Sequence, residues 1–179
     1  MKYWFTSDIH FCHANIIRYC NRPFSSIDEM NQALIERWNA RVGPNDTVYL
    51  LGDVAFGPPA KSIPLLLALN GTIHLITGNH DRKHLGNKLW RSRFASVNDI
   101  RNVTLNTPVG KRTIVMCHFP LLEWEGYYRG AWHVHGHCHG GQPPQQGIPR
   151  LDVGIDCHDW APISLEELTE KIRELCPTA

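Results

Sequence analysis

An α/β fold is predicted for this chain, with a mixed sheet or two packed sheets covered by helices. In the first half of the chain, short apolar runs rich in β-branched residues alternate with segments of helical periodicity, which is the pattern of β-α-β units. In the second half the runs are mainly strand-like. The 179 residues, 42% of them hydrophobic, suit a single compact domain over residues 1–179.

The predicted elements follow one another in chain order, separated by turn signals. Strands are predicted over residues 2–7, 46–51, 73–77, 94–105, 112–117, 132–136 and 151–156. Helices are predicted over residues 26–42, 60–69 and 164–175. The segments 119–131 and 140–150 read as long loops, and long loops inside a compact domain are more often functional than accidental.

Two of the predicted helices begin with the sequence of a capping box. In this motif a hydroxyl and the carboxylate three residues later each satisfy a free backbone N–H at the start of the helix. Ser26 with Glu29, and Ser164 with Glu167, fit the pattern. The first of these helices then carries one apolar stripe, formed by Ile27, Met30, Leu34 and Trp38.

Composition argues against several classes of protein, although a local basic patch for nucleic acid is still compatible with it. The net charge of +1 and the pI near 7.7 give no basic footprint for nucleic acid. The apolar runs are too short to span a bilayer, and the amino terminus lacks the pattern of a signal peptide, so a cytoplasmic protein without membrane contact is expected. The six cysteines form no C-x-x-C pair, which argues against a zinc ribbon and favours free thiols.

Side chains that can bind metals or move protons follow the ends of five predicted strands. The clearest case is Gly78-Asn79-His80-Asp81, directly after the strand over 73–77. The corresponding positions after the other strands hold Asp8 and His10, Asp53, His118, and His137 and His139. Each cluster alone could be a helix cap or a turn, but turn chemistry does not readily produce the same placement five times. Open α/β sheets bind ligands at this edge.

The ordered set Asp8-x-His10, Gly52-Asp53, Gly78-Asn79-His80-Asp81, His118 and Gly136-His137-x-His139 resembles the calcineurin-like metallophosphoesterases. The motifs extend from residue 8 to residue 139, and the length suits a small member without a cap domain. The resemblance implies the fold of that family, a four-layer β-sandwich of two mixed sheets flanked by helices. It also implies a two-metal site at the strand ends.

The same resemblance implies a role for each residue of the motifs. One ion would be held by Asp8, His10, Asp53 and His139. The second would be held by Asp53, Asn79, His118 and His137, so that Asp53 bridges the two ions. His80 would face the scissile phosphate and protonate the leaving oxygen or stabilise developing charge, and Asp81 would orient His80.

The implied reaction is hydrolysis of phosphodiesters or small phosphomonoesters by a hydroxide that bridges two divalent ions. Ligands of mixed imidazole, carboxylate and amide type suit Mn²⁺, with Fe, Zn²⁺ or Ni²⁺ as alternatives. The expected partner is therefore a phosphate-ester substrate, and the oligomeric state stays open. The alternatives are a non-catalytic protein-binding scaffold on the same fold and a phosphoprotein phosphatase. A structural zinc module is disfavoured, because the ligands are spread over most of the chain.

Other residues near the motifs are candidates for substrate contacts or for support of the ligands. His13 and Asn15 follow the first motif, Arg82 follows Asp81, and His135 shares the strand face of His137.

Residues outside the motifs leave further alternatives open. Tyr127, Tyr128 and Arg129 either stack on a base or an aromatic leaving group, or pack within their own loop. Cys12 stands where the resemblance leads us to expect glycine. Cys138, between two expected ligands, is interpreted as a small apolar filler, with a thiolate ligand as the alternative.

Overall fold

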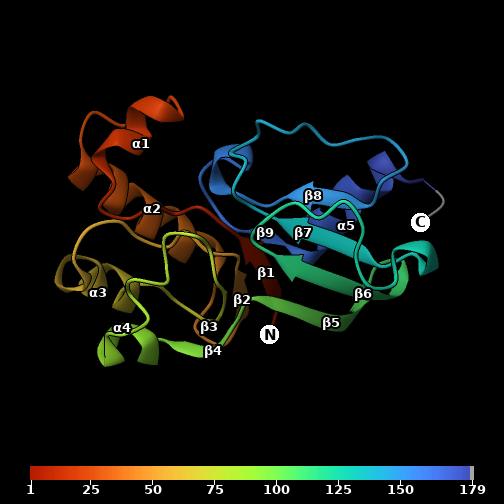
Figure 1. Cartoon of the computed structure of the whole chain (residues 1–179), viewed down its shortest axis with the longest axis horizontal. Coiled ribbons are helices and arrows are strands. Elements are labelled where there is room, and N and C mark those ends of the chain that lie inside the picture. The colour runs from red at the N-terminus through yellow and green to blue at the C-terminus, as the bar shows by residue number, and fades with distance from the viewer. Residues whose placement is uncertain (178–179) are drawn as a thin grey trace.

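The computed structural model describes residues 1–177 and contains two mixed β-sheets (Figure 1). The first sheet has the order β4-β3-β2-β1-β9, and the second has the order β5-β6-β7-β8. In the first sheet β1, β2, β3 and β4 are parallel and β9 is antiparallel. In the second, β5 is antiparallel to β6, whereas β6, β7 and β8 are parallel. The prediction of two mixed sheets flanked by helices is confirmed.

The strands of the first sheet are β1 (Tyr3–Thr6), β2 (Thr47–Leu50), β3 (Thr72–Ile76), β4 (Phe94–Asn98) and β9 (Ile163–Ser164). Those of the second are β5 (Ile100–Thr107), β6 (Gly110–Cys117), β7 (Trp132–His135) and β8 (Arg150–Asp152). The helices are α1 (Ala14–Tyr19), α2 (Ile27–Arg41), α3 (Pro59–Leu67), α4 (Lys88–Ser92) and α5 (Leu165–Leu175), with short 3-10 turns at Tyr127–Arg129 and Ile155–Cys157. Within this part of the chain, none of the helices has both the length and the apolar character that crossing a membrane requires.

Alternate residues of the strands point into two separate cores. In β2, Val48 and Leu50 face the layer of α1, α2, α3 and α4, whereas Tyr49 faces the second sheet. Ile114 and Met116 of β6 meet Tyr49 from the other side. Full burial of such a side chain contributes about 1.5–3 kcal/mol. Helix α5 packs against β1, β5 and β8, and the loop over 119–131 covers the outer face of the second sheet.

The second predicted capping box is complete, and the first is complete only in part. The Ser164 hydroxyl accepts from the Glu167 backbone N–H, and the Glu167 carboxylate accepts from the Ser164 N–H. At α2, Ser26 accepts from the Glu29 N–H as expected. The carboxylate of Glu29, however, accepts from the N–H and hydroxyl of Ser25 rather than from Ser26.

Two of the predicted strands differ from the observed ones. The segment 94–105 was predicted as one strand, but it is divided between β4 and β5, which belong to different sheets. The chain crosses from one sheet to the other at Asp99, whose carboxylate accepts a hydrogen bond from the Thr77 hydroxyl. The predicted strand over 151–156 ends at Asp152 and continues as a 3-10 turn. The short elements α1, α4 and β9 carry too few residues to show a period and were not predicted.

The parallel strands bring the expected site residues to one edge of the sandwich. The register pairs Thr6 with Leu50 and Leu50 with Leu75, so β1, β2 and β3 end side by side. Across the two sheets, the chain after β1 pairs with the chain after β8 at Ser7 and Gly154.

Gly136 allows the two sheets to approach each other at this edge. A Cβ atom at residue 136 would lie 2.0 Å from Ser7 Oγ and 2.4 Å from Asp8 Oδ2, so any side chain there would force the two loops apart. Gly86 offers a matched comparison, because a Cβ at that residue would meet no heavy atom within 4 Å.

We therefore expect Gly136→Ala to lower the free energy of unfolding by about 2 kcal/mol or more, because overpacking of this kind typically costs about 1–3 kcal/mol. In a chain of this size the melting temperature would fall by about 4–8 °C, measured by circular dichroism. Gly86→Ala should leave it within about 1–2 °C. Equal melting temperatures for the two variants would contradict the close approach.

Candidate metal centre

The strand-end loops have an unusual backbone. Five of the expected site residues have left-handed φ values between 47° and 71°, namely Asp8, His10, Asp53, His137 and His139. Residues other than glycine adopt this region rarely, and such strain is concentrated at functional sites. Cys12 has the same conformation, with φ 62°, at the residue where glycine was expected.

Backbone hydrogen bonds hold these loops against one another. The N–H of Asp8 donates to the carbonyl of Gly52 at 3.0 Å, and the N–H of His10 donates to the carbonyl of Asp53 at 3.0 Å. From the second sheet, the N–H of His137 donates to Asp8 Oδ2 at 2.9 Å. The loops that follow β1, β2 and β7 thus form one connected unit.

The first cluster consists of Asp8, His10 and His139, whose ligand atoms all lie within 4.8 Å of one another. Asp8 Oδ1 lies 4.0 Å from His10 Nε2 and 4.0 Å from His139 Nε2. These separations are too long for hydrogen bonds. They match two ligands of one ion, because metal–ligand bonds of about 2.0–2.2 Å put such atoms about 3–4 Å apart.

The second cluster consists of Asp53, His118 and His137, again within 4.8 Å. His118 Nε2 lies 3.6 Å from Asp53 Oδ1 and 3.0 Å from Asn79 Oδ1. The other ring nitrogen of His118 donates to the carbonyl of Leu51 at 2.6 Å, which leaves Nε2 as an acceptor facing the cluster. All the residues that the resemblance assigned to the second ion are therefore present here.

Asp53 stands between the two clusters. Its Oδ2 lies 3.6 Å from His10 Nε2 in the first cluster, and its Oδ1 lies 3.6 Å from His118 Nε2 in the second. The carboxylate is almost fully buried. One oxygen thus faces each group of imidazoles, which is the arrangement that a bridging carboxylate requires.

Unpartnered polar atoms test whether the residues fit a metal. Asp8 Oδ1 and both ring nitrogens of His10 are buried, and among the described residues they have no hydrogen-bond partner. Buried polar atoms normally have such partners, and leaving one without costs about 1–3 kcal/mol. Carboxylate, imidazole and amide atoms converge on the space between the two clusters, and this set of ligand atoms fits divalent cations.

Burial also shifts the pKa values of Asp8 and His10. Burial raises the pKa of Asp8 to about 7, although the nearby His139 and His118 oppose the rise. Burial, followed by the charges of His139 and Arg22, holds the pKa of His10 well below its usual value. His10 is therefore neutral at physiological pH, as a ligand imidazole must be.

His139 is supported by two residues that the sequence analysis did not identify. Its Nδ1 donates to Asp156 Oδ2 at 2.7 Å. Asp156 in turn accepts from Arg22 through Nε at 2.8 Å and Nη2 at 2.9 Å. Burial lowers the pKa of His139, but hydrogen bonds to Asp156 and Cys20 and the charge of Asp8 outweigh it and raise the pKa to about 10. An ion at Nε2 would displace the proton there, whereas Nδ1 would keep its proton for Asp156.

Arg22 also fixes the first loop of the site. Its side chain is fully buried, and it donates to the carbonyls of Asp8 at 2.8 Å and Ile9 at 2.9 Å. No motif marks Arg22, which lies 134 residues from Asp156. Asp156 was open to prediction, since it ends the predicted strand over 151–156 as the other site residues end theirs. Cys20, His139 and Asp156 form a further group whose ligand atoms lie within 4.8 Å of one another. Asp156, however, is already paired with Arg22, so we do not assign an ion to this group.

The position of Asp81 corrects the role that was expected for it. Asp81 Oδ2 accepts from the N–H groups of Gly78 at 2.8 Å and Asp53 at 2.9 Å, and Oδ1 accepts from Val54 N–H at 3.0 Å. Both oxygens are thus engaged by backbone rather than by the imidazole of His80. Adjacency in the sequence does not fix the direction of a side chain, and Asp81 ties the loop after β3 to the loop after β2.

His80 lies at the mouth of the centre with its side chain 37% exposed. Its backbone N–H donates to Asp53 Oδ1 at 2.9 Å, and its Nε2 lies 3.8 Å from Asp53 Oδ2. The ring is 5.2 Å from the ring of Phe56 and 5.7 Å from that of His10. Its position next to the clusters, partly open to solvent, leaves the imidazole accessible to a substrate.

The other candidates fall into different surroundings. His13 and Asn15 line the same pocket as the two clusters, whereas Arg82 lines a separate hollow with Asp99 and Phe119 that shares Asn79 with the site. His135 is buried, and its Nδ1 donates to the carbonyl of Gly136 at 2.9 Å.

The two cysteines next to the motifs have protonated thiols. Burial raises the thiol pKa of both Cys138 and Cys12. For Cys138, a protonated thiol agrees with the interpretation as a small apolar filler.

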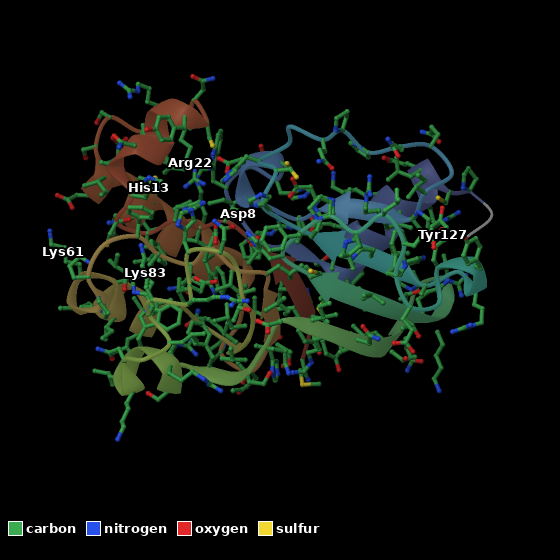
Figure 2. The ribbon with its side chains drawn as sticks, in the orientation of Figure 1. Asp8, His13, Arg22, Lys61, Lys83 and Tyr127 are labelled. Atoms are coloured by element: carbon green, nitrogen blue, oxygen red, sulfur yellow. The ribbon has the colours of Figure 1, made fainter. Side chains whose placement is uncertain are left out.

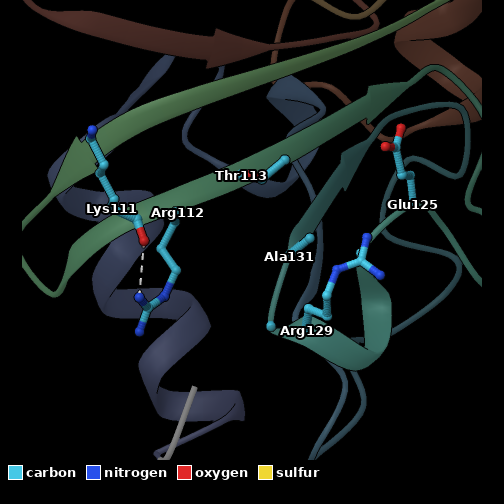
Figure 3. Close-up of a pocket in the computed structure, with 8 residues that line it drawn as sticks. Lys111, Arg112, Thr113, Glu125, Arg129 and Ala131 are labelled. Carbon is cyan, nitrogen blue, oxygen red and sulfur yellow. Dashed lines mark hydrogen bonds between the residues drawn. The ribbon is translucent and has the colours of Figure 1, made fainter.

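The pocket around the clusters has a volume of about 840 Å³. Figure 2 shows Asp8, His13 and Arg22 together near α1, with Tyr127 at the opposite end of the molecule. Tyr127 packs on Trp124 and Tyr128, so the interpretation of this loop as packed on itself is the correct one. Another hollow, of about 450 Å³, lies beside that loop, between Arg112 and Arg129 (Figure 3). Its charged side chains belong to half-buried or exposed residues, and we assign it no function.

Comparisons with known proteins agree with this geometry. The family model described as "Calcineurin-like phosphoesterase" matches residues 1–141. The uncharacterised protein MJ1445 of Methanocaldococcus jannaschii is 34% identical over 97% of this chain and 92% of its own length. The Gene 66 protein of Mycobacterium phage D29 is 28% identical over 96% of each chain.

A solved structure shares the fold. The protein of unknown function AQ665 from Aquifex aeolicus is 23% identical, with a TM-score of 0.70 over 97% of this chain and 98% of its own. The chain therefore belongs to the calcineurin-like phosphoesterase family, whose members are metal-dependent hydrolases of phosphate esters.

Proposed function

We propose that this protein hydrolyses phosphodiesters or small phosphomonoesters with two divalent metal ions. The observation that carries the proposal is the Asp53 carboxylate, which presents one oxygen to each of two groups of ligand atoms. Asp8, His10 and His139 would hold the first ion, and Asn79, His118 and His137 the second. Mn²⁺ is the metal we expect first, since the ligands are oxygen and imidazole nitrogen atoms.

When bound, two divalent ions would polarise the phosphoryl group and lower the pKa of a water molecule, so that a nucleophile is available near neutral pH. The protein determines how much of their charge reaches the substrate. Asp8 and Asp53 neutralise two of the four positive charges, which leaves a net charge of about +2 to attract an anionic phosphate. More carboxylates in the site would remove that attraction.

His80 has the position of the residue that assists the leaving group. Its Nε2 faces the centre, and its hydrogen bond from backbone N–H to Asp53 keeps it next to the phosphoryl position. A proton held at Nε2 can pass to the departing oxygen, because an alcohol is a poor leaving group without one. Asp81 contributes by holding the loops of Asp53 and His80 together.

His80→Ala should lower kcat by about 100- to 10,000-fold, which is the usual contribution of a general acid or base. The two ions should remain bound, because His80 is not among the proposed ligands. Steady-state kinetics on a phosphodiester with an alkyl leaving group, compared with bis(p-nitrophenyl) phosphate, whose leaving group needs little protonation, and elemental analysis of the protein would check both statements. His74→Ala is the control, since His74 pairs with Ser96 away from the centre. Loss of metal from the His80 variant would contradict the assignment.

Asp53→Asn should reduce the metal content from two ions per chain to fewer than one, because the amide cannot bridge two cations with two anionic oxygens. Elemental analysis after dialysis would measure this, and circular dichroism would show whether the fold is kept. Asp28→Asn, an exposed change in the first turn of α2, should retain both ions. If the Asp53 variant kept two ions and normal turnover, the bridge would be wrong.

Asp156→Asn should weaken binding of Mn²⁺ by about 10- to 100-fold, the usual effect of removing a carboxylate that orients a ligand histidine. The amide can still accept a hydrogen bond, but it no longer stabilises the His139 tautomer by its charge. Calorimetric titration of the metal-free protein with Mn²⁺ would measure the change. Unaltered affinity would show that His139 needs no such support.

A further inference from the structure

The candidate pocket is larger than the reaction centre requires. Its volume of about 840 Å³ lies within the range of roughly 300–1,000 Å³ found for pockets that take whole small molecules. The two clusters occupy one side of it. The rest is lined by residues of α1 and its flanking loops and by Phe56, so the pocket has room for the organic part of an ester.

This second side carries an ordered group of aromatic rings. The His13 ring lies on the Phe56 ring with centroids 4.2 Å apart and an angle of 13° between the planes. The Tyr19 ring meets His13 edge-on at 6.4 Å and is 63% exposed. The ammonium group of Lys83 lies 3.9 Å from the centre of the Phe56 ring, and such cation–π contacts help to hold the ring in place.

The aromatic group lies on the side where the leaving group would depart. His80 is the residue proposed to protonate the leaving oxygen, and Phe56 meets its ring edge-on at 5.2 Å. From His80 the surface continues through Phe56 and His13 to Tyr19. A leaving group protonated by His80 would therefore extend along these rings.

The surrounding polar groups favour a heteroaromatic ring over a purely apolar one. Asn15 and Asn21 line the pocket near Tyr19, and their amides can donate and accept hydrogen bonds. The Arg18 guanidinium lies 5.7 Å from the Tyr19 ring, so it places a cation at the same end of the pocket as that ring. The amides suit the edge of a nucleobase, and the rings suit its face.

We propose that Tyr19, next to the stacked rings of His13 and Phe56, forms a stacking subsite for a nucleobase, so that the substrates are nucleotide phosphate esters. This inference rests on the proposed function and specifies its substrate class. Tyr127 and Tyr128, the residues that the sequence suggested for stacking, lie in a loop at the other end of the molecule (Figure 2). The base would instead lie on Tyr19, with its phosphate toward Asp53.

The test compares adenosine 5′-monophosphate with ribose 5-phosphate, which differ only in the base. Both are titrated calorimetrically into the Mn²⁺-loaded His80→Ala variant, which should bind them with little turnover, and used as competitive inhibitors of bis(p-nitrophenyl) phosphate hydrolysis by the wild-type protein. We expect the nucleotide to bind about 5- to 150-fold more tightly, the range that stacking of one base supplies. Tyr19→Ala should bring this ratio close to one, whereas Tyr19→Phe should preserve it.

Tyr128→Ala is the matched control, because Tyr128 is also highly exposed but lies away from the pocket, where it should leave the ratio unchanged. Equal affinities of the two phosphates for the wild-type protein would overturn the subsite while bis(p-nitrophenyl) phosphate is still hydrolysed. So would a ratio that survives Tyr19→Ala. Absence of both hydrolysis and phosphate binding would instead overturn the proposed function itself.

Discussion

The geometry of the centre depends on the close approach of loops from two sheets at one edge of the sandwich. At this edge five polar residues have left-handed backbone conformations, and each such residue costs of the order of 1–3 kcal/mol. Asp and His tolerate the region somewhat better than bulkier residues. Hydrogen bonds between the loops, such as His10 N–H to the carbonyl of Asp53, stabilise a conformation that neither loop would keep alone.

The same close approach gathers charges and lone pairs that cannot satisfy one another. Asp8 Oδ1 and the His10 ring nitrogens are buried without partners, and Asp8 is held so far from water that burial raises its pKa to about 7. A cluster of this kind is poorly stabilised when empty, and cations relieve it by supplying positive charge to the carboxylates. The two hydrophobic cores stabilise the fold and so offset the cost of this strained and poorly paired edge.

Much of the site could be predicted because parallel strands share one edge. Asp8, Asp53 and Asn79 follow β1, β2 and β3, so their relative placement follows from the period of the apolar runs. The role of Asp81 could not be predicted, because the direction of its side chain depends on which backbone N–H groups the tertiary structure brings near it. Arg22 escaped prediction for the same reason, since its partner Asp156 is distant in the sequence.

The fold shows the same division between local and long-range information. The completed capping box at α5 involves residues three apart and was predicted, whereas the exchange of sheets at Asp99 was not. The local pattern of residues 94–105 predicts one strand. The division of this segment between two sheets depends on how the sandwich packs. The stacked rings of His13 and Phe56 belong to loops that follow different strands, so no pattern within either loop could indicate their contact.

The two halves of the centre differ in their contact with solvent, and this difference fits the proposed reaction. In the first cluster, Asp8 and His10 are buried, and His139 is supported from behind by the chain from Asp156 to Arg22. In the second, His137 and Asn79 are exposed. An ion in the first half would therefore have mostly buried ligands, whereas an ion in the second would have the exposed His137 and Asn79 beside the buried His118.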